Sequence, residues 1–346
     1  MWFKNIQVYR FTRSIEQSAE DIAGLLERHE FTPCSTQQPN STGWTSPLGR
    51  QGNDFVHAAN GYIMVCNKTQ EKLLPAAVVN EELEEKILEI EEAQARKVSR
   101  KERTSLKEEI TFNLLPMAFA RSRVDFAYLC VNEGMLVLNS SSEKKADELV
   151  SNLRKALGSL PVVPLECLSD PVATMTDWVK TGRCSADFSL GEECELQSEA
   201  DSTRVIRCKN QDLGTDEILA HLKAGMRVTK LALTWKDRLD FVLDEKLMLK
   251  RIGFTDVMQD ELANNTESAD DKVTQFDVDF SIMTLEYSSF INDLTVALGG
   301  VKSTDAERGK RGETDDNIPA TASVDGDNSD GGSEDKFEEQ GELEQV

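Results

Sequence analysis

The 346-residue sequence has no apolar run near the roughly eighteen residues of a membrane-spanning helix, and it opens directly on a strand-like segment. A membrane span, a secretory signal and a transit peptide are therefore not expected. The seven cysteines are scattered and contain no C-x-x-C pair, and the chain has only three histidines. Cys66 and Cys130 lie in apolar segments typical of inert core thiols. This pattern favours reduced thiols in a cytosolic protein and argues against a zinc site.

Signatures of common reaction centres are also missing: the sequence has no G-x-S-x-G, P-loop, H-E-x-x-H or G-x-G-x-x-G motif. Asp277 and Asp279 would share one face of a predicted strand, but no third acid or histidine stands at ligand spacing. His57 and His221 have no evident nucleophile or orienting acid beside them. We therefore predict a binding protein and not an enzyme, with no catalytic residue, cofactor or metal.

The charge of the chain is strongly negative, at −23, which argues at first against a nucleic-acid partner. Residues 301–346 hold five Lys or Arg and fourteen Asp or Glu, or −9, with hardly an aromatic, and this composition predicts a disordered acidic tail. Residues 1–300 carry the other −14 in blocks of opposite sign. A chain with a negative net charge can therefore still present a basic surface.

The segment Glu81–Arg123 has the clearest change of sign. It reads as one long helix with Asn80 as N-cap, acidic first turns and a narrow apolar stripe. Residues 96–123 contain eight Lys or Arg and three Asp or Glu, a charge of +5. Pro116 interrupts the helix among large apolar residues. Two interpretations stay open: a solvated helix that docks its apolar end into the main body, or a projecting arm that contacts phosphates and a partner.

Strand and helix signals flank this segment. Before it, the patterns predict a strand over 2–11, a helix with a Ser14–Gln17 capping box, a loop over 31–54 anchored by Trp44, and strands over 61–66 and 71–75. After it, they predict a hairpin of 125–131 with 135–139, a helix over 142–157 ended by Gly158, and an extended segment at 161–164.

The second half begins with a helix around Trp178 and an exposed acidic loop over 187–201. Further elements are expected as follows: a strand over 203–208, a helix between Thr215 and Gly225, an antiparallel meander of 226–235, 238–243 and 247–254, a strand over 276–283 and a helix over 284–298. Five cations against Asp237 alone give part of this region a charge of +4: Lys223, Arg227, Lys230, Lys236 and Arg238.

These elements predict an α+β fold with mixed or antiparallel sheets, packed helices, a protruding helical arm and a disordered acidic tail. We expect a central α/β domain from 1–75 and 124–168, the arm (76–123) inserted in it, a C-terminal α+β base domain (169–300) and the tail (301–346).

Several stretches together resemble one known family. They occur there in this order: Trp2-Phe3-Lys4-Asn5, Phe31-Thr32-Pro33-Cys34, Gly43-Trp44, Ala59-Asn60-Gly61, Leu114-Leu115-Pro116 with Ala118-Phe119, the Gly158 to Pro164 segment, Gln211-Asp212-Leu213 and Val228 to Leu233. The family is that of the bacterial recombination-associated RdgC proteins, and the resemblance spans residues 1 to about 300.

The resemblance implies a cytoplasmic, nucleoid-associated protein that encircles DNA as a ring-shaped homodimer. It implies binding of double- and single-stranded DNA without sequence specificity, and antagonism of RecA-dependent recombination by occupying the DNA. The basic residues expected to bind DNA, together with one glutamine, are Arg96, Lys97, Arg100, Lys101, Arg121, Arg123, Arg207, Lys209, Gln211, Lys223, Arg227 and Lys230. The apolar residues expected at the dimer interface are Leu115, Met117 and Phe119.

Two other functions compete with this one. The first is an acidic protein-interaction module that acts directly on a recombinase, with DNA contact incidental. The second is a nuclease with an unrecognised site, which would break DNA down when Mg²⁺ is added. Retention on immobilised non-specific duplex at low salt, with no other protein present, separates the DNA binder from the interaction module.

Overall fold

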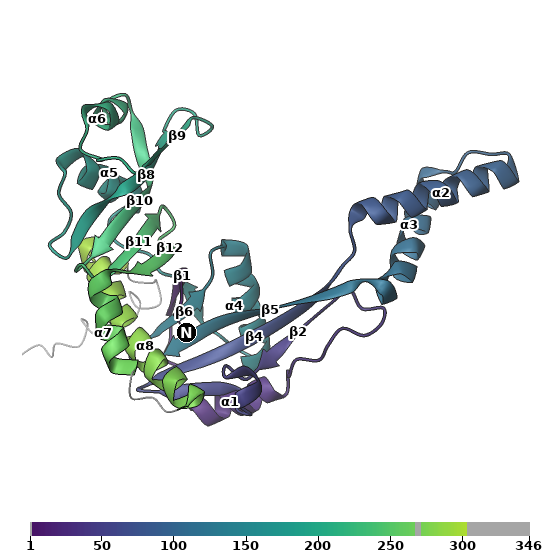
Figure 1. Cartoon of the computed structure of the whole chain (residues 1–346), viewed down its shortest axis with the longest axis horizontal. Helices are drawn as coiled ribbons and strands as arrows, with labels where there is room; N and C mark the ends of the chain where they lie inside the picture. The colour runs from purple at the N-terminus through teal and green to yellow at the C-terminus, as the bar shows by residue number, and fades with distance from the viewer. Residues whose placement is uncertain (1, 267–270, 303–346) are drawn as a thin grey trace, which may run out of the picture. The chain divides into compact units, whose positions relative to one another are not determined.

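The computed structural model describes residues 2–266 and 271–302 (Figure 1). The described residues belong to one compact unit, Met1–Ser303. The predicted tail lies outside the described residues, apart from Val301 and Lys302.

The described strands form one twelve-stranded sheet in the order β2-β4-β5-β6-β1-β12-β11-β10-β8-β9, with β3 beside β4 and β7 beside β1. The strands are β1 (Ile6–Phe11), β2 (Asn40–Thr45), β3 (Val56–Ala59), β4 (Tyr62–Leu73), β5 (Phe119–Cys130), β6 (Met135–Asn139), β7 (Val162–Pro164), β8 (Phe188–Ser198), β9 (Val205–Lys209), β10 (Met226–Trp235), β11 (Leu239–Asp244) and β12 (Leu249–Phe254).

Every pairing between these strands is antiparallel. The predicted hairpin is β5–β6, which turns at Gly134 with a φ of 66° that favours glycine, and the predicted meander is β10–β11–β12. The α+β class with an open antiparallel sheet is confirmed. The ring-shaped dimer stays a prediction.

Eight α-helices and two short 3₁₀ turns complete the described part of the chain. They are α1 (Ala19–Glu27), η1 (Gly49–Gln51), α2 (Ala76–Gln94), α3 (Arg100–Leu114), η2 (Leu115–Met117), α4 (Glu143–Leu157), α5 (Pro171–Thr181), α6 (Asp216–Lys223), α7 (Asp256–Thr266) and α8 (Lys272–Ala297). Two of these helices begin or end at predicted residues: Gly158 ends α4 and Thr215 precedes α6.

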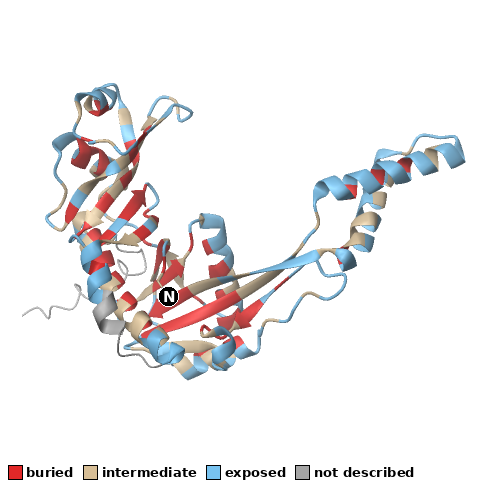
Figure 2. Ribbon diagram, in the orientation of Figure 1, coloured by how far each residue is buried: buried red, intermediate tan, exposed pale blue. Residues whose placement is uncertain are grey.

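The two faces of the sheet pack into two separate cores. On one face, Tyr9 of β1 and Ile63 of β4 pack against α1 and α4, and among the described residues no side chain of β8–β12 joins this core. On the other face, Ile6 and Met64 belong to a larger core that continues through β8–β12 and includes α5, α6 and α8. Figure 2 shows these buried residues as red segments along the strands. Over β8–β12, the described helices therefore pack on only one face of the sheet.

The larger core contains residues from both the predicted central and base domains. Strand β1 pairs with β12 as well as with β6, so the sheet also runs through both. The division of residues 1–300 into a central domain, an arm and a base domain stays a prediction.

The segment 81–123 is not one helix, and this prediction is wrong. Helix α2 begins after Pro75 and ends at Ala95, whose φ of 52° is left-handed, and α3 restarts after Ser99, which caps the N–H of Glu102. Residues 119–123 then join β5, because β5 pairs with β4 along all twelve residues, from Cys130 to Phe119. Figure 1 shows β4 and β5 running together to α2 and α3.

Three features of the first half also differ from the predictions. Ser18 and not Ser14 is the N-cap of α1, where it forms a capping box with Asp21. The predicted loop contains β2, which pairs with β4 and buries Trp44. The strands expected over 61–66 and 71–75 are one strand, β4. The second half of β4 is polar, so the sequence did not indicate that the strand continues.

In the second half, the predicted acidic loop is strand β8, whose alternate residues Cys194 and Leu196 are buried while its acids face outward. The predicted strand 276–283 is part of the single helix α8, whose apolar residues at helical spacing pack on the sheet. Helix α7 was not predicted. The strand over 276–283 was predicted from apolar alternation in a short window, which does not exclude a helix, whereas the loop was predicted from acidic composition alone.

The observed N-cap can be tested by substitution. Ser18 Oγ accepts from the N–H of Asp21, and Asp21 accepts from the N–H and hydroxyl of Ser18, which lowers the pKa of Asp21. We expect Ser18→Ala to lower the free energy of unfolding by about 1 kcal/mol. Ser14→Ala is the matched control and should change it by less than about 0.5 kcal/mol in urea denaturation. Equal losses in both variants would contradict this N-cap.

Candidate nucleic-acid interface

The uncovered face of β8–β12 carries the charged side chains of these strands. Cys194 and Leu196 of β8 point into the core, so Glu195 between them points to the open face. The same alternation puts Arg207 of β9 and Lys230 of β10 on this face. Three elements that are separate in the sequence therefore present charges side by side.

These charges form a row across the strands. Arg207 is opposite Glu195, Glu195 is opposite Lys230, and Lys230 is opposite Asp244 of β11. Glu195 accepts from Arg207 Nε and from Lys230 Nζ, both at 2.7 Å, and Lys250 Nζ of β12 lies 2.8 Å from Asp244 Oδ2. The row alternates in sign, with a cation on β9, β10 and β12. Since neighbouring strands lie about 4.8 Å apart, each cation is about 10 Å from the next.

A hollow of about 450 Å³ opens over this row. Its lining includes five cations and two acids, or +3, and the cations are Arg207, Lys209, Lys230, Lys250 and Arg251. Three of these were predicted to bind DNA, whereas Lys250 and Arg251 were not. The sequence did contain a signal for them. Two adjacent basic residues stand at 250–251 within a predicted strand.

Glu193 belongs to a second, shorter row of charged residues beside the first. It is opposite Lys209, and its Oε2 lies 2.9 Å from the guanidinium of Arg251. Burial acts to raise the pKa of Glu195, but hydrogen bonds from Lys230 and Arg207 outweigh it and lower that pKa. Glu195 is thus an ionised partner of two cations of this face.

The +4 expected around 223–238 is largely neutralised, which the sequence did not reveal. Arg227 pairs with Glu199 at 2.8 Å, Lys236 Nζ lies 2.6 Å from Asp293, and Arg238 contacts both Glu261 and Glu286. Glu199 follows the end of β8, and the other acids lie on α7 and α8, so counting local charge missed them. Lys223 is exposed at the end of α6, and Gln211 is held by weak bonds to Thr215 and Glu217.

The basic residues of the arm are partly paired in the same way. Arg96 binds both carboxylate oxygens of Glu102, and Lys97 Nζ lies 2.7 Å from Glu91. Arg100 and Lys101 are exposed in the first turn of α3. These four cations lie on α3 and on the connection before it, and they do not line the hollow over β8–β12.

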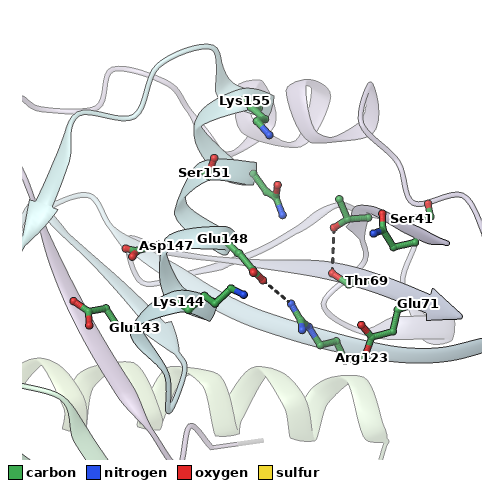
Figure 3. A pocket seen from close by; sticks show the side chains of 13 residues that line it. Ser41, Thr69, Glu71, Arg123, Glu143, Lys144, Asp147, Glu148, Ser151 and Lys155 are labelled. Carbon is green, nitrogen blue, oxygen red and sulfur yellow. Dashed lines mark hydrogen bonds and ion pairs between the residues drawn. The ribbon is translucent and has the colours of Figure 1, made fainter. Parts of the chain in front are cut away.

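Arg121 and Arg123 lie on β5 and not on a helix. Arg121 is exposed, while Arg123 binds Asp125 at 3.0 Å and Glu148 of α4 at 3.1 Å. Arg123 lines a groove of about 900 Å³ between α4 and strands β2, β4 and β5. Figure 3 shows its contact with Glu148 and, along the same groove, Lys144 and Lys155. With four acids and three cations, this groove has no surplus of positive charge.

The three residues expected at a dimer interface differ in exposure. Leu115 is buried at the end of the arm, whereas 73% of Met117 and 85% of Phe119 are exposed. Leu73 is opposite Phe119 in the β4–β5 ladder and is itself half exposed. An apolar patch of Leu73, Met117 and Phe119 therefore lies at the outer end of this ladder.

The reactive side chains that the sequence singled out have structural surroundings. Burial raises the pKa of the Cys66 thiol to about 12 and that of Cys130 to about 11. Among the described residues, no group of three or more His, Cys, Asp or Glu side chains lies close enough to hold a metal ion. None of the described helices combines the length and apolar character that a membrane crossing requires.

Two predictions about acids and histidines are corrected. Asp277 and Asp279 lie on helix α8, where residues two apart point about 200° apart, so they do not share a face. Asp277 instead lies beside His57, with Oδ1 3.1 Å from Nε2, and Phe276 and Phe280 contact the same ring. The two polar atoms are close without forming a hydrogen bond.

The described residues define an α+β protein whose sheet leaves a cation-rich face open to solvent. A family model described as "Putative exonuclease, RdgC" matches residues 1–301. The chain belongs to the RdgC family, and the resemblance seen in the sequence is confirmed.

Three relatives carry the name Recombination-associated protein RdgC. The protein of Tolumonas auensis is 46% identical over 88% of this chain and 100% of its own length. The protein of Psychromonas ingrahamii is 44% identical over the same shares, and that of Pseudomonas aeruginosa is 42% identical over 87% and 98%.

Proposed function

We propose that this protein binds DNA without sequence specificity, encircles it as a homodimer and limits RecA-dependent recombination by occupying it. The observation that carries the proposal is the open face of β8–β12, where five cations and two acids line one hollow. Phosphate contacts from such a surface give affinity but carry no base information.

The relatives named for recombination support a role for this chain in the same process. A protein that covers DNA competes with a recombinase for the same sites, so occupancy alone limits recombination. We propose that the chain holds DNA without cutting it, although the family description includes an exonuclease. DNA breakdown on adding Mg²⁺ would contradict this part of the proposal.

The exposed apolar patch at the outer end of β4 and β5 supports self-association. Phe119 and Met117 are large apolar side chains on a segment with little core of its own, and a two-fold dimer buries the same patch of both copies. We propose that this contact closes one side of the ring and leaves the cation-rich faces directed at the enclosed DNA.

The first test of DNA binding is its dependence on salt. If roughly six phosphates are neutralised, log K should fall against log[salt] with a slope near −5. Fluorescence anisotropy with two labelled duplexes of unrelated sequence and one single strand measures this directly. Affinity that does not change with salt, or strong preference for one duplex, would contradict the proposal. Absence of binding at low salt would favour an interaction module that acts on the recombinase itself.

The contribution of the open face can be isolated with a double variant. Lys209→Ala with Arg251→Ala removes two cations of the hollow, so affinity should fall and the salt slope should become shallower by about 2. Lys272→Ala, at the exposed start of α8, is the control and should leave the slope unchanged. Equal effects of the double variant and the control would show that general charge and not this face decides binding.

The apolar patch can be tested through the oligomeric state. Phe119→Ala should shift the dimer toward monomer in analytical ultracentrifugation and weaken DNA retention, because an exposed aromatic anchor is lost. Leu88→Ala removes a similarly exposed apolar side chain from α2 and should leave the dimer intact. Circular dichroism should be unchanged in both variants. A dimer that survives Phe119→Ala would place the interface elsewhere.

A further inference from the structure

Glu195 lies at the centre of the charged row, and its contacts differ from those of the other acids there. It binds Arg207 and Lys230 through side chains on both sides, at 2.7 Å each, and only 15% of its own side chain is exposed. Asp244, by contrast, also accepts from the N–H groups of Lys246 and Met248 and holds the turn between β11 and β12. Glu195 therefore engages the cations more than it supports the backbone.

We propose that Glu195 is an internal competitor for phosphate that limits the affinity of this face for DNA. The inference rests on the proposed function, since it assumes that DNA binds here. A carboxylate and a phosphate offer the same kind of anionic oxygen to Arg and Lys donors. Glu195 occupies the position between two cations that a phosphate oxygen would take.

The geometry makes this competition direct. Arg207 and Lys230 are 68% and 40% exposed, so each can turn toward a phosphate on the solvent side. Each cation that turns away breaks a charge-assisted hydrogen bond and leaves Glu195 ionised, poorly hydrated and close to an incoming negative charge. Binding by these two residues therefore releases fewer ions and gains less free energy than two unpaired cations would.

Low affinity of this kind suits a protein that encloses DNA. A closed ring prevents escape without strong contacts, whereas strong contacts would hold it at one position. The alternating row gives weak contacts along the inner face, each replaceable by a carboxylate that is already present.

The test is Glu195→Gln, which keeps the shape of the side chain and removes its charge. We expect about tenfold tighter binding of a non-specific duplex at low salt and a slope of log K against log[salt] steeper by 1 to 2, or about one unit per freed cation. The slope distinguishes competition from a structural role, because a merely structural glutamate would not add phosphate contacts when neutralised.

The matched control is Glu286→Gln. Glu286 is 14% exposed and also binds a cation, Arg238, but it belongs to α8 on the other face of the sheet. Glu286→Gln changes the net charge by the same amount as Glu195→Gln. The affinity of this control for duplex should stay within about threefold of the wild type. Thermal unfolding of both variants verifies that they are folded. A second arm repeats Glu195→Gln in an Arg207→Ala, Lys230→Ala background, where the gain should disappear.

The outcomes separate this inference from the proposed function. Salt-dependent binding by the wild type, with Glu195→Gln equal to it or weaker, overturns the competition and leaves DNA binding intact. A gain that persists in the background lacking Arg207 and Lys230 also overturns it, since the effect would be one of net charge alone. Failure of every protein to bind duplex at low salt overturns the proposed function and this inference together.

Discussion

The sheet has two faces, and the described helices cover them unequally: the core on one face extends from β4 to β9. Helix α8, 26 residues and about 39 Å long, supplies the core with Phe280, Tyr287 and Phe290. The hydroxyl of Tyr287 donates to the buried carbonyl of Phe3 at 2.6 Å, which ties this helix to the start of the chain. Helices α1 and α4 cover the second face only over the strands of the first half. The open face of β8–β12 follows from this unequal covering.

An uncovered sheet face must be polar, and here it is polar in an ordered way. The register of β9, β8, β10 and β11 puts opposite charges directly opposite one another, which stabilises an antiparallel sheet by a few tenths of a kcal/mol per pair or somewhat more. The same pairs prevent the edge-to-edge and face-to-face association that an apolar face would invite. The charges thus support the fold as well as the proposed interaction with DNA.

Elements with strong local signals could be predicted from the sequence. The meander β10–β12 and helix α4 have clear periodicity with turn or capping residues at their ends, such as Gly158. Elements whose character depends on distant partners could not. Strand β8 is acidic because its outward residues pair with cations of β9 and β10, and the outer half of β5 is a strand only because β4 lies beside it.

The candidate interface was predicted in part for the same reason. Arg207, Lys209 and Lys230 were found from their sign and their strand positions, and the register brings them together with Lys250 and Arg251. Their partners Glu193 and Glu195 lay in a stretch that composition alone marked as loop. Counting charges along the sequence covers only one segment at a time. Which acid pairs with which cation depends on the order of the strands in the sheet, and no single segment determines that order.

A net charge of −23 and the proposed DNA-binding face are compatible because electrostatic interactions in salt are short in range. At physiological ionic strength the Debye length is about 8 Å, so a phosphate at the open face interacts mainly with the charges in and beside the hollow. There the five cations outnumber Glu193, Glu195 and Asp244 by two. At low salt the acids elsewhere on the chain act over longer distances and oppose binding. Lowering the salt therefore strengthens each contact and the general repulsion at once, and the curve of log K against log[salt] should flatten at its dilute end.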